Sequence, residues 1–207
     1  MATVTSKTKA EFDRKEMERR GQLKPKISNP LLDDMGSPLV VYRGGMQNDP
    51  IQTEGFKLGS LQLGPGAYFG GKGVAEEFAR NRPNGIVKKF HLHIQKPFDE
   101  TQKLNPSDKQ MNLLRKNLLE VGVPNIYVNE LDKPYRGAIT NLAEALSKKS
   151  TMQGKSMTNW EAADHINAAI KKAGFDGIIA DWHEGGEQYV AFNKKQIKHL
   201  ENELTDK

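Results

Sequence analysis

The sequence predicts an α+β fold, in which short strands and helices alternate around one core. Three longer segments carry apolar residues at helical spacing, and five short runs rich in β-branched or aromatic residues have the length of strands. Many of the 19 glycines lie in the loops that connect these segments. A chain of 207 residues can form one domain with a proper core, but it is too short for two full domains.

The first half of the expected domain contains three strands and a brief helix. The run Pro38-Leu39-Val40-Val41-Tyr42 is typical of a buried strand that ends at Arg43-Gly44-Gly45. Ala67-Tyr68-Phe69 predicts a second short strand, and residues 73–80 predict a helix after it. Residues 86–94 predict a half-exposed strand, because their second half alternates between apolar and polar side chains.

The second half contains three helices and two strands. Helices are expected over 108–120, over 137–149 and from Thr158 to Gly174, where Thr158 and Glu161 have the spacing of a capping box. Two strands, at 177–180 and 188–192, flank a polar loop over 181–186. The side chains expected to face inward are Val74, Ala75 and Phe78 in the brief helix, and Trp160, Ala163, Ile166 and Ile170 in the last helix.

Composition excludes several classes of protein. Hydrophobic residues make up 36% of the chain and charged residues 28%, and no apolar run approaches the length of a membrane-spanning helix. The charged N-terminus lacks the apolar stretch of a secretory signal, so we expect a protein without a membrane partner that acts in the cytoplasm of the producing cell or of a target cell. Because the chain has no cysteine, it has no disulfide, no thiolate metal site and no cysteine nucleophile.

The basic charge is concentrated at the N-terminus. The net charge of the chain is +5, and residues 1–26 contribute +4 of it through eight basic and four acidic side chains. We expect residues 1–30 to form a basic extension without a core of its own, and residues 31–207 to form the domain. The extension is the candidate for contact with nucleic acid, because lysine and arginine bind phosphates.

Three separated fragments carry the candidate chemistry. In Tyr42-Arg43-Gly44-Gly45, a cationic side chain precedes two residues that let a ligand approach the backbone. In the fragment from Gly64 to Gly71, Tyr68 and Phe69 are strand neighbours, so one ring would enter the core and the other would face a cleft. In Glu187-Gln188-Tyr189-Val190, a carboxylate and an amide stand at the mouth of a buried strand. Each fragment alone also fits an ordinary turn.

Together the three fragments resemble the ADP-ribosyltransferase superfamily, in particular the small bacterial and phage-type domains of polymorphic toxins and polyvalent proteins. The resemblance covers about residues 36–200: Pro38 to Gly44 matches the opening strand, and Gly66 to Phe69 with Ala75 to Phe78 matches the second motif. Tyr189 to Lys198 matches the closing strand and its Gln-Ile-Lys. The resemblance implies a split β-sheet that binds NAD+ as substrate in a bent conformation and releases nicotinamide.

The resemblance also implies roles for individual residues. Gly44 would offer its backbone to the nicotinamide amide, and Arg43 would reach the ribose or the diphosphate of NAD+. The aromatic residues of the NAD+ site would be Tyr68, Phe69 and Phe78. No metal is expected, since His91 and His93 share a strand face but lack the other ligands of a metal site.

The catalytic position has two candidates. The family's catalytic glutamate usually precedes the Tyr-Val strand, where this chain has Gln188, with Glu187 one residue earlier. Gln188 can bond a ribose hydroxyl but cannot accept a proton. On a regular strand Glu187 would point the other way, unless the preceding double glycine forms a bulge that turns it inward.

The residues leave three hypotheses open. The leading one is a mono-ADP-ribosyltransferase that modifies a protein or a nucleic acid, as a toxin, a phage protein or an effector. The second is a degenerate module that binds NAD+ or ADP-ribose without turnover. The third is an RNA-directed transferase or nucleic-acid binder whose extension, residues 1–26, holds phosphates.

Overall fold

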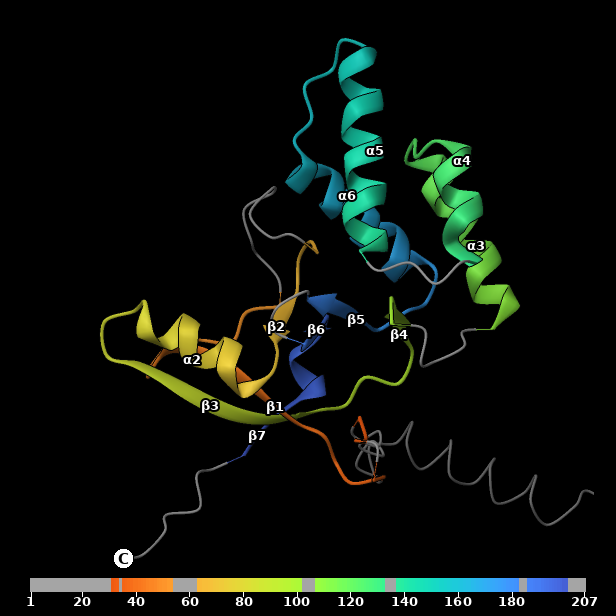
Figure 1. The fold of residues 1–207 in the computed structure, drawn as a ribbon. Helices are drawn as coiled ribbons and strands as arrows, with labels where there is room; N and C mark the ends of the chain where they lie inside the picture. Colours follow the sequence, from red (N-terminus) through yellow and green to blue (C-terminus); the bar gives the residue numbers. More distant parts are fainter. Residues whose placement is uncertain are drawn as a thin grey trace, which may run out of the picture.

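Two β-sheets, packed face to face and flanked by helices, form the body of the protein in a computed structural model (Figure 1). The structure describes six stretches of the chain: residues 31–33, 35–53, 63–101, 107–132, 137–182 and 186–200. The predicted basic extension, residues 1–30, lies outside the described residues. Within these stretches no helix is both long and apolar enough to cross a membrane.

The smaller sheet has three antiparallel strands in the order β1-β3-β7. Its strands are β1 (Val40–Met46), β3 (Gly85–Leu92) and β7 (Ile197–Leu200). The larger sheet has the order β2-β6-β5-β4, antiparallel except for the parallel pair β4–β5. Its strands are β2 (Ala67–Phe69), β4 (Pro97–Asp99), β5 (Gly177–Trp182) and β6 (Gly186–Ala191). The predicted α+β fold with a split sheet is therefore confirmed.

The core has two parts, one on each face of the larger sheet. Between the sheets, Val41 and Phe90 of the smaller sheet pack with Phe69, Tyr189 and other residues of the larger one. On the opposite face of the larger sheet, Val190 and Ile178 pack against the helical layer. Neighbouring residues of β6 therefore contribute to different parts of the core, as the alternation of side chains along a strand requires.

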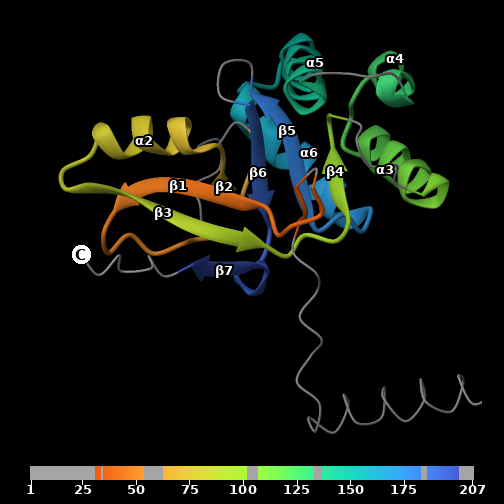
Figure 2. The ribbon, with the colours of Figure 1, turned by 60° about the horizontal axis from the view of Figure 1, so that its bottom comes forward.

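The helical layer covers the larger sheet, whereas one helix lies on the smaller sheet (Figures 1 and 2). The layer contains α3 (Asp108–Glu120), the short α4 (Asn125–Val128), α5 (Ala138–Met152) and α6 (Asn159–Lys172); α2 (Lys72–Arg80) lies on β1 and β3. The capping box at Thr158 is confirmed: its side chain accepts from the Glu161 N–H at 3.2 Å, and the Glu161 carboxylate accepts from the Thr158 N–H at 2.8 Å.

Two predicted inward-facing side chains are instead exposed. Phe78 is 53% exposed, and α2 packs through Ala75 and Ala79. This packing is close because a Cβ on Gly44 would overlap the Ala75 carbonyl oxygen, so the backbones of β1 and α2 leave no room for a larger side chain between them. Trp160 is 46% exposed because it lies in the first turn of α6, before the buried face of that helix begins at Ala162.

The closing strand is longer than expected, and a glutamine anchors the segment after it. The strands β5 and β6 extend to Trp182 and from Gly186, so part of the predicted 181–186 loop is strand. After β6, the Gln196 side chain accepts from the Phe192 N–H at 3.0 Å and donates to the Asp176 carbonyl at 2.7 Å. The glutamine of the Gln-Ile-Lys motif thus ties the start of β7 to the larger sheet.

Candidate functional site

The three sequence fragments meet where β1 crosses the end of β2. The N–H and the carbonyl of Tyr42 each bond Gly70 at 2.9 Å, which joins the smaller sheet to the larger one. On its other side β2 pairs with β6, and Phe69 stands opposite Tyr189. Figure 2 shows β1 and β3 passing across the strands of the larger sheet at this place. Residues far apart in the sequence therefore form one candidate site.

Arg43 lies at this crossing, where its guanidinium has one hydrogen-bond partner among the described residues. Its Nη1 donates to the Tyr68 carbonyl at 3.2 Å, and its guanidinium carbon lies 6.0 Å from the centre of the Phe69 ring. Burial, followed by the nearby charge of Arg82, lowers the pKa of Arg43. Within the described part of the chain, no acidic side chain forms an ion pair with Arg43. A half-buried guanidinium of this kind can bind an anion.

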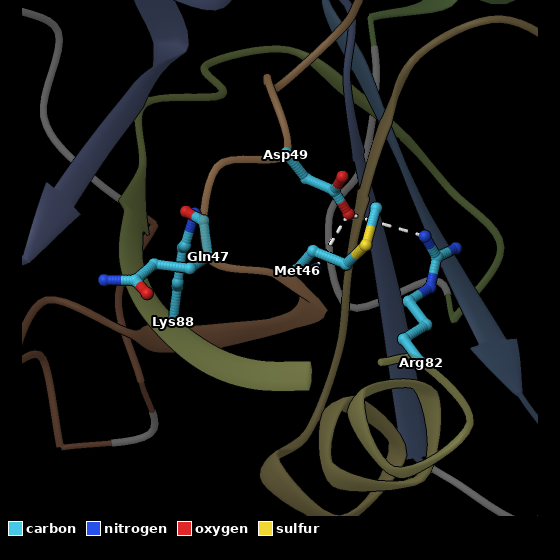
Figure 3. A network of polar contacts seen from close by, with 5 residues as sticks. All are labelled: Met46, Gln47, Asp49, Arg82 and Lys88. Carbon is cyan, nitrogen blue, oxygen red and sulfur yellow. Dashed lines mark hydrogen bonds and ion pairs between the residues drawn. The ribbon is translucent and has the colours of Figure 1, made fainter. Parts of the chain in front are cut away.

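A polar network next to Arg43 fixes the chain that leaves β1 (Figure 3). The Asp49 carboxylate accepts from the Met46 N–H at 2.8 Å and pairs with Arg82 at 3.4 Å. Lys88, the cross-strand partner of Arg43, donates to the Gln47 carbonyl at 2.6 Å. Sequence patterns do not reveal these residues, because no local pattern connects Asp49 with Arg82, 33 positions later.

Gly44 presents its backbone toward β2 and its Cα toward α2. Peptide groups along a strand alternate between the two edges, so the N–H and carbonyl of Gly44 face the same edge as those of Tyr42, which bond Gly70. A Cβ on Gly44 would also lie 2.7 Å from the Ala79 nitrogen. The position therefore accepts only glycine, and its peptide edge is directed toward the candidate site.

Tyr68 and Phe69 point to opposite faces of the larger sheet. Phe69 is buried between the sheets in an edge-on contact with Phe90, with ring centres 5.1 Å apart. The half-buried Tyr68 packs against the helical part of the core. Its hydroxyl donates to the Gly64 carbonyl at 2.7 Å and accepts from the Leu63 N–H at 3.0 Å. Burial raises the pKa of Tyr68 far above its usual range.

The third aromatic candidate, Phe78, lies on α2, the helix that packs on β1 and β3. It lies one turn after Ala75, whose carbonyl borders Gly44. Its side chain is the most exposed of the three aromatic candidates. The structure thus gives Phe78 no place in the core and leaves its ring available to a ligand.

Glu187 and Gln188 lie on different faces of β6. Pairing with β5 runs without interruption from Gly177 opposite Ala191 to Trp182 opposite Gly186, so these pairs contain no bulge. The Glu187 carboxylate accepts a hydrogen bond from the Tyr189 hydroxyl. Gln188 alternates to the other face, and its buried Oε1 atom has no hydrogen-bond partner among the residues that the structure describes. A buried acceptor without a partner is uncommon and marks a place where a donor from a ligand would fit.

Comparison with known proteins decides the family. The model of one family, ADP-ribosyltransferase in polyvalent proteins, matches residues 33–207, which is most of the chain. The chain belongs to this family. It is an ADP-ribosyltransferase domain of phage or bacterial type, and the family uses NAD+ as its substrate.

Other comparisons add little about this ADP-ribosyltransferase domain. A solved structure titled "Crystal structure of an anti-CRISPR protein" is similar over 78% of this chain and 95% of its own, at 11% identity and a TM-score of 0.44. Similarity at this level supports no functional argument. No curated protein matches the chain.

The chemistry available to the ADP-ribosyltransferase domain depends on the geometry of the crossing. Arg43 supplies a cation, the Gly44 peptide supplies a donor and an acceptor, and Gln188 supplies an acceptor. In the described ranges, no group of three or more His, Asp or Glu side chains is placed to hold a metal ion. The side chains at the crossing are of the kinds that bind a charged, hydroxyl-rich ligand.

Proposed function

We propose that this domain transfers a single ADP-ribose group from NAD+ to an acceptor on a protein or a nucleic acid. The bond between the nicotinamide nitrogen and the ribose breaks, and a bond forms between the ribose and the acceptor. Nicotinamide and the acceptor's proton leave. The proposal is carried by one observation: the Arg43, Tyr68–Gly70 and Glu187–Gln188 fragments converge where β1 crosses β2.

Each part of NAD+ has a suitable partner at this crossing. The guanidinium of Arg43 suits the diphosphate or a ribose oxygen, because a guanidinium binds such groups through several N–H donors at once. The peptide edge of Gly44 that faces the crossing suits the nicotinamide amide, which has both a donor and an acceptor. Phe78 and Tyr68 suit the nicotinamide and ribose as aromatic surfaces. The Phe69 ring lies next to the Arg43 guanidinium and stabilises its charge.

Cleavage of the bond between nicotinamide and ribose needs an anionic or dipolar group beside the ribose. Positive charge develops on the sugar as nicotinamide leaves, and a fixed anion or dipole stabilises it. Gln188 offers the dipole of its buried Oε1, and Glu187 offers a carboxylate on the opposite face. A glutamine stabilises a cation less than a carboxylate does and cannot take up a proton, so we propose slow turnover in the wild-type domain.

Labelled NAD+ tests the proposal. Purified protein is incubated with NAD+ labelled in the adenylate part and with bacterial lysate, and released nicotinamide is measured by chromatography. Protease and nuclease digestion then show which polymer carries the label. We expect nicotinamide release together with label on a macromolecule. Arg43→Gln should abolish most of both, whereas Arg80→Gln, on the exposed side of α2, should abolish neither. Absence of label and of nicotinamide release in the wild type would refute transfer.

The glutamine at position 188 favours a second candidate function. Because its neighbour Glu187 lies on the other face of β6, no carboxylate of that strand replaces it. The domain would then bind NAD+ or ADP-ribose without cleaving it. Calorimetry that shows NAD+ binding, combined with no nicotinamide release over hours, would favour the binding module over the transferase.

A further inference from the structure

The turn that leads into β2 is held by side chains from a distant helix. Asn167 of α6 donates from its Nδ2 to the Leu63 carbonyl at 2.8 Å, and Lys171 of the same helix donates to the Pro65 carbonyl at 3.2 Å. The Tyr68 hydroxyl bonds the same turn, at Leu63 and Gly64. The turn is therefore held between α6 and β2.

The contact between this turn and α6 is tight. Asn167 is only 1% exposed, and a Cβ on Gly64 would lie 2.6 Å from the Asn167 Cβ. Gly64 also has a φ of +75°, a conformation that other residues adopt at a cost. Neither side of the contact can shift without disturbing the other, because close-packed interiors transmit displacement.

A continuous series of hydrogen bonds connects Asn167 with Arg43. Asn167 bonds the Leu63 carbonyl, and the Leu63 N–H bonds the Tyr68 hydroxyl. The Tyr68 carbonyl in turn accepts from Arg43 Nη1. Asn167 is not itself one of the candidate NAD+-binding residues. The positions of the Tyr68 ring and of the Arg43 guanidinium nevertheless depend on the turn that Asn167 holds.

We propose that Asn167 is a positioning residue of the NAD+ site, acting through the Leu63–Gly64 turn on Tyr68 and Arg43; this rests on the proposed function. Its role is to fix the two binding groups before NAD+ arrives, so that binding does not have to order them. Loss of the Asn167 amide therefore weakens NAD+ binding more than it slows the cleavage step.

The chain offers a matched control for this proposal. Asn117 of α3 is also a buried asparagine, 2% exposed, and its Nδ2 donates to a backbone carbonyl, that of Ala169, at 3.2 Å. It belongs to the same helical layer, but its amide is bonded to α6 rather than to the turn before β2. Asn117→Ala and Asn167→Ala remove the same atoms from equally buried places, so they separate a general loss of packing from a specific effect on the site.

The experiment compares steady-state nicotinamide release by the wild type, Asn167→Ala and Asn117→Ala, well below their unfolding temperatures. For Asn167→Ala we expect the KM for NAD+ to rise about tenfold, the scale of coupling carried by such contact networks, with kcat within about twofold of wild type. For Asn117→Ala we expect wild-type KM and kcat despite a comparable fall in Tm. Equal KM values for the two variants would overturn the proposal. If Asn167→Ala does not fold, it is replaced by Asn167→Ser, which has a hydroxyl in place of the amide and more volume than alanine, with the same expected direction.

A double-mutant cycle tests the route through Tyr68. Tyr68→Phe removes the hydroxyl that bonds the turn, so combining it with Asn167→Ala should raise KM by much less than the product of the two single effects. If the effects of the two substitutions on KM multiply, Asn167 does not act through the Tyr68 hydroxyl.

A readout without NAD+ separates this proposal from the proposed function. Hydrogen exchange of the Leu63 amide, which bonds Tyr68, should become faster in Asn167→Ala and remain unchanged in Asn117→Ala. Unchanged exchange in Asn167→Ala would refute the positioning role. If the wild type neither binds nor cleaves NAD+ but the exchange rates differ as expected, the coupling stands and the proposed function fails.

Discussion

Glu187 and Gln188 are consecutive residues of β6 whose side chains lie on opposite faces of the larger sheet. The Glu187 carboxylate already accepts a hydrogen bond from the Tyr189 hydroxyl between the sheets. The Gln188 Oε1 is buried on the face that carries the helical layer, with no partner within the described stretches of the chain. Only one of the two is a buried acceptor that still needs a donor, and a ribose hydroxyl is such a donor.

Substitutions at these two positions should therefore differ in effect. Gln188→Ala should lower kcat/KM for NAD+ about tenfold or more, the cost of a lost hydrogen bond in a buried site, and Glu187→Gln should cost less. Gln188→Glu should raise kcat, because it places an anion where charge develops. Nicotinamide release measured for the three variants checks this order. A greater loss in Glu187→Gln than in Gln188→Ala would move the catalytic role to Glu187.

Binding of fragments of NAD+ tests whether Arg43 binds the diphosphate. Arg43→Gln should weaken binding of ADP-ribose, which carries the diphosphate, about tenfold or more, and should leave the affinity for nicotinamide alone unchanged. Wild-type binding of ADP-ribose should also weaken as salt is added, with a smaller slope in the variant. Calorimetry at two salt concentrations measures both effects. Equal weakening for both ligands would show that Arg43 supports the fold rather than the diphosphate.

Gly44 and Gly73 form a pair in which the same substitution should have opposite effects. Gly44→Ala places a methyl group against the backbone of α2 and should destabilise the protein by about 1–3 kcal/mol or more. Gly73, in α2, has nothing within 4 Å of an added Cβ, so Gly73→Ala should stabilise by roughly 0.5–1 kcal/mol through helix propensity. Urea unfolding measures both. A wild-type midpoint for Gly44→Ala would mean that α2 does not pack on β1 in this way.

The sequence predicts long periodic elements well and tertiary contacts poorly. The helices α3, α5 and α6 occur where their periodicity places them, since each has three or more turns of pattern. The short strands β4 (Pro-Phe-Asp) and β7 (Ile-Lys-His-Leu) escape prediction because each mixes apolar with charged or polar residues, whereas the three-residue β2 (Ala-Tyr-Phe) has no charged residue. Of the predicted inward face of α2, Ala75 is buried as expected but Phe78 is exposed, because the contact with Gly44 is between backbones, which favours alanine over a large apolar side chain.

In the candidate site, too, the sequence predicts local geometry but not contacts between separate elements. Alternation along a strand correctly separates Tyr68 from Phe69, and it separates Glu187 from Gln188 once the structure shows that β6 has no bulge there. The roles of these residues in NAD+ binding stay predictions. The pairing of Asp49 with Arg82 and of Asn167 with Leu63 leaves no trace in local sequence, because the partners are brought together only by the packing of separate elements.

Phe78 should affect binding without affecting stability. Because its side chain is half exposed on α2, Phe78→Ala should change the free energy of unfolding by less than about 0.5 kcal/mol. Loss of an aromatic surface for nicotinamide should raise the KM for NAD+ about fivefold, within the usual energy of ring stacking. Trp160→Ala, at a similarly exposed position on α6, is the control and should leave KM unchanged. An unchanged KM in Phe78→Ala would remove this residue from the NAD+ site.

Tyr68 should make the protein less stable at high pH. Its pKa is raised by burial in the folded state, whereas an unfolded tyrosine ionises near pH 10. The protonated hydroxyl is thus favoured by folding, and its contribution to stability is complete below about pH 10 and declines as the pH rises above that value, because the unfolded state then releases the proton first. Urea unfolding at pH 8 and pH 11 should show a larger loss of stability for the wild type than for Tyr68→Phe. Tyr127→Phe, at a partly exposed position, should behave as wild type. Identical losses in wild type and Tyr68→Phe would show that the Tyr68 hydroxyl is not held by Leu63 and Gly64 in solution.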